Sequence, residues 1–104
     1  QGFNDVCVEV LGAEAPARTD PDDPFVRLVV ETAQDVYGQP MQIVPMVGGS
    51  GPNHLFMETI GAPIVTAGVG YPGALAHAPN ENLRLDLYLK GARHIARILK
   101  AFSV

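Results

Sequence analysis

Residues 41–69 read MQIVPMVGGSGPNHLFMETIGAPIVTAGV, and this stretch decides the expected fold. Residues 41–44 and 64–69 are short, largely apolar runs of the kind found in strands that are buried on both faces. Between them lie a glycine-rich turn and a segment, residues 53–60, that predicts a helix. A strand, a helix and a second strand in this order indicate an α/β fold with a mostly parallel sheet.

The segment before this stretch predicts one more strand and a boundary. Residues 5–11 alternate, with Val6, Val8 and Val10 on one face, which is typical of a half-buried strand. Residues 12–23 are rich in Pro, Ala and Asp and have no periodicity. They predict a linker, and a domain boundary in this chain is expected there.

Two further helices are expected on either side of the central stretch. Asp23 is the predicted N-cap of a helix that begins at Pro24 and ends at Gly38. Asp86 is the predicted N-cap of the last helix. The apolar stripe of that helix is expected to comprise Leu87, Gly91, Ile95, Ile98, Leu99 and Phe102.

Composition excludes several classes of protein. With 104 residues the chain is long enough for one modest domain, and its net charge of -4 argues against a nucleic-acid partner. Cys7 is the single cysteine, so no disulfide can form within the chain and a cytoplasmic location is expected. No apolar run approaches the roughly 20 residues that span a bilayer, so no membrane partner is expected. Because position 1 is Gln and a strand pattern begins almost at once, we expect a piece of a larger protein.

The first loop that could carry chemistry is residues 48–52, Gly-Gly-Ser-Gly-Pro. Glycines let a backbone approach a ligand closely, and the free N–H groups of the following helix favour an anion. The alternative is an ordinary strand-to-helix turn capped by Ser50 or Gly51. A nucleophilic Ser50 is not expected, because the nucleophile elbow requires a glycine at the position that Pro52 occupies.

The second loop, residues 74–81, contains His77. Imidazole is a common metal ligand and proton shuttle, although a lone loop histidine can also be merely solvated. Asn80 and Glu81 could brace the loop or support the ligand. We expect His54 and His94 to be helix surface residues. No other metal-binding pattern completes a set, so the sequence offers one candidate ligand where a zinc site needs three or four.

The order of these motifs resembles the C-terminal part of one zinc metallopeptidase family. The family includes cytosolic dipeptidases, acetylornithine deacetylase, succinyl-diaminopimelate desuccinylase, aminoacylase and glutamate carboxypeptidase. The resemblance covers the chain from about Asp5, and its most specific part is the histidine motif followed by a helix. The matching motifs are Val47-Gly48-Gly49-Ser50-Gly51-Pro52, Gly61-Ala62-Pro63-Ile64-Val65, Gly68-Val69-Gly70 and Ala76-His77-Ala78-Pro79-Asn80-Glu81.

The resemblance implies a fold and a division of the chain. Residues 1–15 would be the end of a lid domain that mediates dimerisation, contributing its last strand. Residues 16–104 would be the C-terminal half of an α/β/α catalytic domain. A homodimer is therefore implied for the full-length form.

The resemblance also implies roles for individual residues. His77 would be the last metal ligand of a site with two zinc ions, for which cobalt or manganese can substitute. The substrate, a small peptide or N-acyl amino acid, would lie beside Gly49, Ser50 and Gly51, and Asn80 and Glu81 would hold the histidine loop.

The chain departs from the family pattern because the other ligands and the catalytic glutamate are absent from it. They are expected upstream of Gln1, so the chain contains no catalytic residue and is predicted to be inactive by itself. Two other functions stay open: a non-catalytic piece used for interaction, and an anion-binding module that uses residues 48–52.

Overall fold

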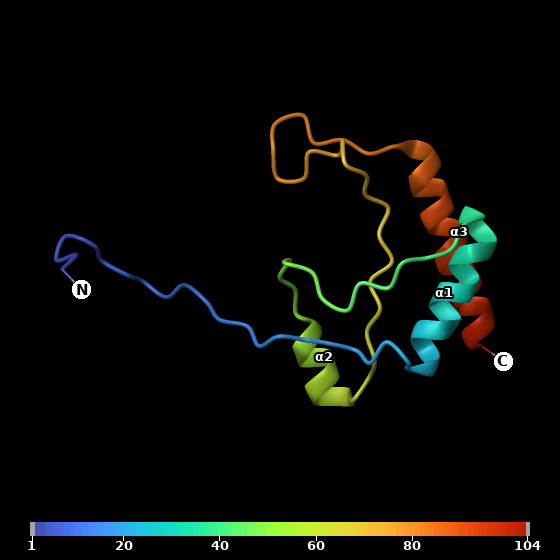
Figure 1. The fold of residues 1–104 in the computed structure, drawn as a ribbon, viewed down its shortest axis with the longest axis horizontal. Coiled ribbons are helices and arrows are strands. Elements are labelled where there is room, and N and C mark those ends of the chain that lie inside the picture. The colour runs from blue at the N-terminus through green and yellow to red at the C-terminus, as the bar shows by residue number, and fades with distance from the viewer. Residues whose placement is uncertain (1, 104) are drawn as a thin grey trace.

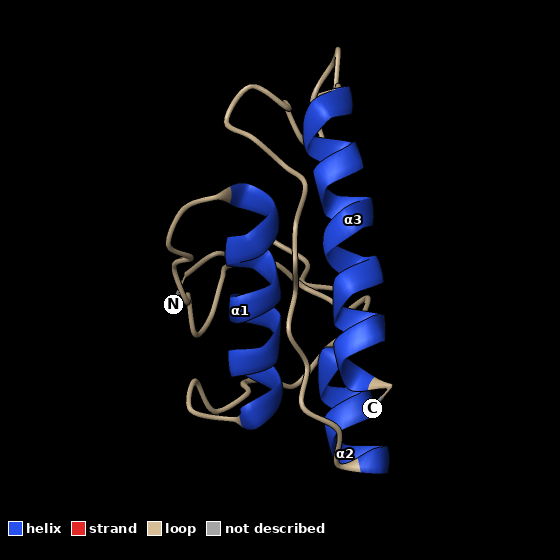
Figure 2. Ribbon diagram, turned by 90° about the vertical axis from the view of Figure 1, so that its right-hand side faces the viewer, coloured by secondary structure: helices blue, strands red, loops and turns tan. Residues whose placement is uncertain are grey.

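The computed structural model describes residues 2–103, and its regular elements are all helices (Figures 1 and 2). They are α1 (Pro24–Tyr37), α2 (Asn53–Ile60) and α3 (Leu85–Phe102). No strand is present within residues 2–103. The predicted α/β/α layering with a mostly parallel sheet is therefore wrong for this part of the chain.

The predicted strands are absent because a strand exists only where its backbone pairs with another. Residues 5–11, 41–44 and 64–69 run without regular structure and form no ladder with one another. The backbone of Ile64 instead bonds to a side chain: the Thr19 hydroxyl donates to the Ile64 carbonyl oxygen at 2.7 Å and accepts from its N–H at 2.9 Å. Periodicity predicts which residues a strand would bury, but it does not supply the neighbouring strand.

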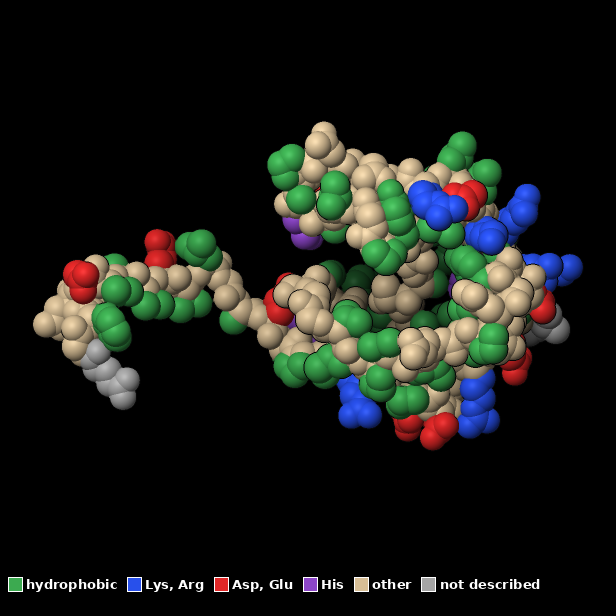
Figure 3. Space-filling model, turned by 45° about the horizontal axis from the view of Figure 1, so that its top comes forward, with side chains coloured by type: hydrophobic (Ala, Val, Ile, Leu, Met, Phe, Trp, Pro, Cys, Tyr) green, Lys and Arg blue, Asp and Glu red, His purple; other side chains and the backbone are tan. Residues whose placement is uncertain are grey.

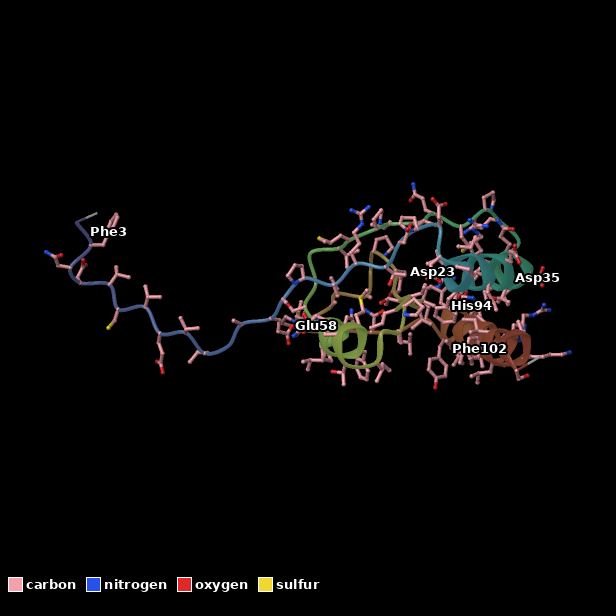
Figure 4. The ribbon with its side chains drawn as sticks, turned by 90° about the horizontal axis from the view of Figure 1, so that it is seen from below. Phe3, Asp23, Asp35, Glu58, His94 and Phe102 are labelled. Carbon is pink, nitrogen blue, oxygen red and sulfur yellow. The ribbon has the colours of Figure 1, made fainter. Side chains whose placement is uncertain are left out.

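The valines of the N-terminal segment show the consequence. Val6, Val8 and Val10 remain 60%, 84% and 79% exposed. The segment extends away from the helices, with Phe3 near its far end (Figure 4). It therefore has no apolar surface to pack against among the described residues.

Helix α1 has the ends that its sequence predicts. The Asp23 carboxylate accepts a hydrogen bond from the Phe25 N–H at 2.7 Å, and Pro24 fills the first helical position, where an N–H would have no partner. At the other end Gly38 adopts φ 69° and donates its N–H to the Gln34 carbonyl oxygen at 2.8 Å. Both predicted ends of α1 are confirmed.

The N-termini of α2 and α3 differ from the predictions. Pro52 is the N-cap residue of α2, and no side chain caps that helix, so the expected cap by Ser50 or Gly51 is wrong. Helix α3 begins at Leu85, which places Asp86 inside its first turn and not at the N-cap. Asp86 pairs with the Arg84 side chain instead, because its carboxylate lies 2.7 Å from the guanidinium.

The core lies between α1 and α3, which pack side by side (Figure 2). Its buried apolar residues are Val26, Val29 and Ala33 of α1, and α3 contributes Gly91 and His94. His94 is only 3% exposed, so its predicted surface position is wrong; the helix pair buries it (Figure 4).

The predicted apolar stripe of α3 is only partly used. Leu87 and Ile98 are half-buried and Gly91 is buried, whereas Leu99 and Phe102 are 64% and 69% exposed. Exposed apolar side chains are visible over much of the surface (Figure 3). None of the three helices of residues 2–103 combines the length and apolar character needed to cross a bilayer.

Candidate functional site

The loop that contains His77 runs between Tyr71 and Asn82, and the Asn82 side chain organises it. The Tyr71 hydroxyl donates to Asn82 Oδ1, and Asn82 Nδ2 donates to the carbonyl oxygens of Gly73 at 3.0 Å and Asn80 at 3.1 Å. The Asn82 N–H adds a bond to the Ala74 carbonyl oxygen at 3.0 Å. One amide side chain and its backbone thus join both sides of the loop.

Three residues of this loop that are not glycine have left-handed backbones. Their φ angles are 54° for Leu75, 61° for His77 and 65° for Asn80. Asparagine and histidine enter this region more readily than other residues, whereas leucine adopts it at a cost of about 1 kcal/mol or more. Such conformations persist where surrounding bonds enforce them, and they cluster at functional sites. The bonds of Asn82 supply that enforcement here.

The histidine side chain itself is exposed. Within residues 2–103, no hydrogen bond engages the His77 ring. The backbone N–H of Glu81 donates to the Ala78 carbonyl oxygen at 3.3 Å, and Asn80 contributes its carbonyl oxygen to Asn82. The imidazole therefore projects from a braced loop and is available to a ligand.

An ion pair fixes the point where this loop enters α3. Arg84 donates to Asp86 through Nε at 3.0 Å and through a terminal nitrogen at 2.7 Å, and its guanidinium lies 6.0 Å from the centre of the Tyr71 ring. The hydrogen bond from Arg84 lowers the pKa of Asp86 below its ordinary value, and desolvation opposes this only in part. The same bond raises the pKa of Arg84. Both charges are solvated, so the pair orients the loop end more than it stabilises the fold.

The glycine-serine loop occupies a different place. Gly49, Ser50 and Gly51 line a hollow of about 870 Å³ between α1 and residues 41–47 and 64–68. Apolar side chains from α1 and from both extended segments form much of its wall. The loop thus lies at the edge of a largely apolar space.

The three predicted substrate-binding residues all line this hollow, but the structure does not join them to the histidine loop. His77, Asn80 and Glu81 are not among the residues that line this hollow. In Figure 1 both loops lie on the side of the molecule away from α1 and α3. No hydrogen bond connects them in the part of the chain that the structure describes.

The described residues do not assemble a complete metal site. No group of three or more His, Cys, Asp or Glu side chains converges within residues 2–103. His94 uses its ring for the helix pair, and His54 Nδ1 is buried without a partner. Among residues 2–103, His77 is therefore the one exposed histidine, and it can supply one ligand of the three or four that zinc requires.

Sequence reasoning missed the residues that position the histidine loop. Asn82 carries most of its bonds, yet an asparagine just before a helix gives no distinctive signal. Gly91 did carry a signal, because glycine inside a helix is unfavourable and its presence suggests a packing reason. Thr19, in the linker, gave no sequence signal of its bonds to Ile64.

Comparison with known proteins identifies the class of protein, a family of peptidases. The family model described as "Peptidase family M20/M25/M40" matches residues 5–101. The chain belongs to this family. No curated protein and no solved structure matches the chain.

Proposed function

We propose that this chain forms part of a metal-dependent amidohydrolase in which His77 supplies one metal ligand. The observation that carries the proposal is the exposed His77 imidazole on a loop braced by Asn82, within a chain that belongs to a peptidase family. The reaction is hydrolysis of the amide bond of dipeptides or N-acyl amino acids.

The conformation of the loop supports a ligand role for His77. Three left-handed residues that are not glycine, held together in one braced loop, are uncommon in an ordinary surface turn, whereas a metal ligand must be held in one direction. Asn80 and Glu81, which lie within the same braced loop, would maintain that direction. This is the support that metal ligands generally receive from neighbouring groups.

The metal site would be completed by other parts of the protein. The donor set of residues 2–103 fits one position of a zinc site and no more. Two zinc ions, or cobalt or manganese in their place, would polarise the amide carbonyl and activate water when bound. His77 would hold its metal through a neutral ring nitrogen.

The glycine-serine loop would bind the substrate carboxylate. Gly49, Ser50 and Gly51 line a hollow of about 870 Å³, within the range of small-ligand sites, and their N–H groups and the Ser50 hydroxyl would donate to the carboxylate. The α2 N-terminus follows directly and favours an anion at this position. An apolar wall behind the loop would receive the substrate side chain.

The division of the chain is part of the same proposal. Residues 1–15 would complete a lid domain that mediates homodimerisation, and residues 16–104 would belong to the catalytic domain. The lone Cys7 supports a cytoplasmic location. The isolated chain would hydrolyse nothing, because it supplies a single ligand.

The proposal is tested with the protein in its full-length form, loaded with zinc. His77→Ala is expected to lower kcat/KM by at least about 100-fold, since loss of a mere supporting residue already costs 10–100-fold in metal affinity or activity. The bound metal per protein, measured by elemental analysis, should fall as well. His54→Ala is the matched control and should leave both quantities unchanged.

A different result would favour the anion-binding alternative. If His77→Ala retains full metal content and full activity, the ligand role of His77 is wrong. Retained binding of a dipeptide carboxylate in that variant, with binding lost in Gly49→Pro, would then assign the function to residues 48–52 alone.

A further inference from the structure

Gly91 lies in the N-terminal half of α3, where the helix meets the segment that leads to the histidine loop. It is buried, and glycine is unfavourable in a helix interior, so a packing reason is expected. A Cβ atom built on Gly91 would overlap Val69 Cγ1 and would lie 3.7 Å from Val69 Cβ. Valine is stiff about χ1, so its methyl group cannot move aside easily. The missing side chain therefore permits this close approach.

Val69 is placed directly before the histidine loop. Two residues later comes Tyr71, whose hydroxyl donates to Asn82 on the opposite side of the loop. The distance between Val69 and α3 at Gly91 thus determines the position of the first residues of the loop. A shift of Val69 would be passed on to the loop through a very short stretch of backbone.

The other end of the loop is anchored to the same helix. The chain passes from Asn82 through Arg84 into α3, and Arg84 lies against both Asp86 and the Tyr71 ring. Both ends of the loop are therefore held against α3. Movement of Val69 away from Gly91 would change the spacing of the two ends.

Neighbouring contacts prevent the segment and the helix from adjusting freely. Thr19 binds both backbone groups of Ile64, at the start of the segment. His94 Nε2 lies 3.0 Å from the Val29 carbonyl oxygen, which fixes α3 to α1 close to Gly91. A methyl group added at position 91 would therefore displace Val69 rather than α3.

We propose that Gly91 is a positioning residue for the His77 loop: its missing side chain lets Val69 pack on α3 and so aims the imidazole. The part that concerns catalysis rests on the proposed metal-ligand role of His77. The packing part does not, because it concerns only the contact between Val69 and Gly91 and the loop that follows.

The experiment is a double-mutant cycle of Gly91→Ala and Val69→Ala in the full-length protein. Gly91→Ala adds the methyl group that overlaps Val69 Cγ1, and Val69→Ala removes that Cγ1. Gly12→Ala is the control, because a Cβ there meets nothing within 4 Å. Hydrogen exchange is read at the amides of Ala74 and Asn82, which bond to Tyr71 and Ala74 across the loop.

Gly91→Ala is expected to accelerate exchange at these two amides by roughly tenfold through easier local opening. It should also lower kcat/KM by about 100-fold, the effect of a displacement near 1 Å at a reacting group. In the Val69→Ala background the same substitution should change neither quantity more than about twofold, because the overlapping methyl is gone. This comparison does not require Gly91→Ala alone to fold.

The outcomes separate the two proposals. Unchanged exchange in Gly91→Ala, or an equal effect of Gly91→Ala with and without Val69, would overturn the positioning role. If His77→Ala retains metal and activity while the exchange cycle behaves as expected, the metal-ligand proposal fails and the packing role of Gly91 stands.

Discussion

The α1–α3 pair and the extended segments of this chain have similarly apolar sequences but differ in how far their side chains are buried. The helix pair contains the most deeply buried side chains of the described residues, whereas residues 5–11 and 41–47 leave valines and an isoleucine about half exposed or more. A helix satisfies its backbone hydrogen bonds internally and needs only one apolar neighbour. A strand needs a second backbone beside it before its side chains can be buried. The same apolar content therefore gives a core in one region and open surface in the other.

The largest expected effect on this difference comes from removing the polar contact inside the helix pair, because that contact stabilises the buried region. His94 Nε2 lies 3.0 Å from the Val29 carbonyl oxygen and 3.2 Å from Thr32 Oγ1. Because a carbonyl can only accept, Nε2 is assigned as the donor. His94→Ala leaves that carbonyl without this partner and opens a cavity, so it should lower the free energy of unfolding by about 2–3 kcal/mol.

Chemical denaturation of the full-length protein measures this loss, with His54→Ala as the control. His54 already has an unpartnered buried Nδ1, so its removal should cost little. A change below about 0.5 kcal/mol in His94→Ala, the level of ordinary surface substitutions, would mean that the helix pair does not depend on this contact.

The second prediction concerns Ile64, whose backbone hydrogen-bonds to a side chain instead of to a neighbouring strand. The Thr19 hydroxyl serves both the N–H and the carbonyl oxygen of Ile64, as a paired backbone would. Thr19→Val keeps the shape but removes both bonds, and the half-buried backbone of Ile64 loses its partner. We expect a loss of about 1–2 kcal/mol.

Thr66→Val is the matched control, because it makes the same chemical change at an exposed position of the same segment. Equal unfolding midpoints for Thr19→Val and Thr66→Val would show that the Thr19 bonds contribute nothing. A selective loss in Thr19→Val would confirm that residues 64–69 depend on this side chain.

Much of the helical structure was predictable from local chemistry. Asp23, Pro24 and Gly38 mark the ends of α1 because caps act over one turn and need no distant partner. The sheet was not predictable in the same way, since residues 5–11 and 64–69 specify a strand only when another strand is present. The burial of His94 was not predictable for a related reason: its hydrogen-bond acceptor, the Val29 carbonyl oxygen, lies on another helix.

The candidate site shows the same division between local and distant information. His77 and the glycine-serine loop could be singled out from their motifs. The residue that braces the histidine loop, Asn82, and the contact that sets its depth, between Gly91 and Val69, depend on segments folding back on one another. Sequence patterns identify groups capable of chemistry more readily than the groups that aim them.

The smallest expected effect lies at the start of α3, where the loop and helix regions meet. Arg84 lowers the pKa of Asp86 in the folded protein, so this carboxylate stabilises the helix start above the pKa it has when unfolded. The contribution is lost as the pH falls through the lower, folded pKa. Its position in the first turn adds a favourable interaction with the helix dipole in the charged state.

The first helical hydrogen bond, from the Tyr88 N–H to the Arg84 carbonyl oxygen at 3.0 Å, reports on this change. Its amide chemical shift, followed by NMR from pH 7 downward, should stay constant until the acid range in which Asp86 is protonated and should then move. Asp86→Asn removes the carboxylate and should abolish that step while keeping the shape of the side chain. An identical acid step in both proteins would assign it to another group and leave the pair with Arg84 without influence on the helix start. Its loss in Asp86→Asn would place the boundary between loop and helix under the control of one exposed ion pair.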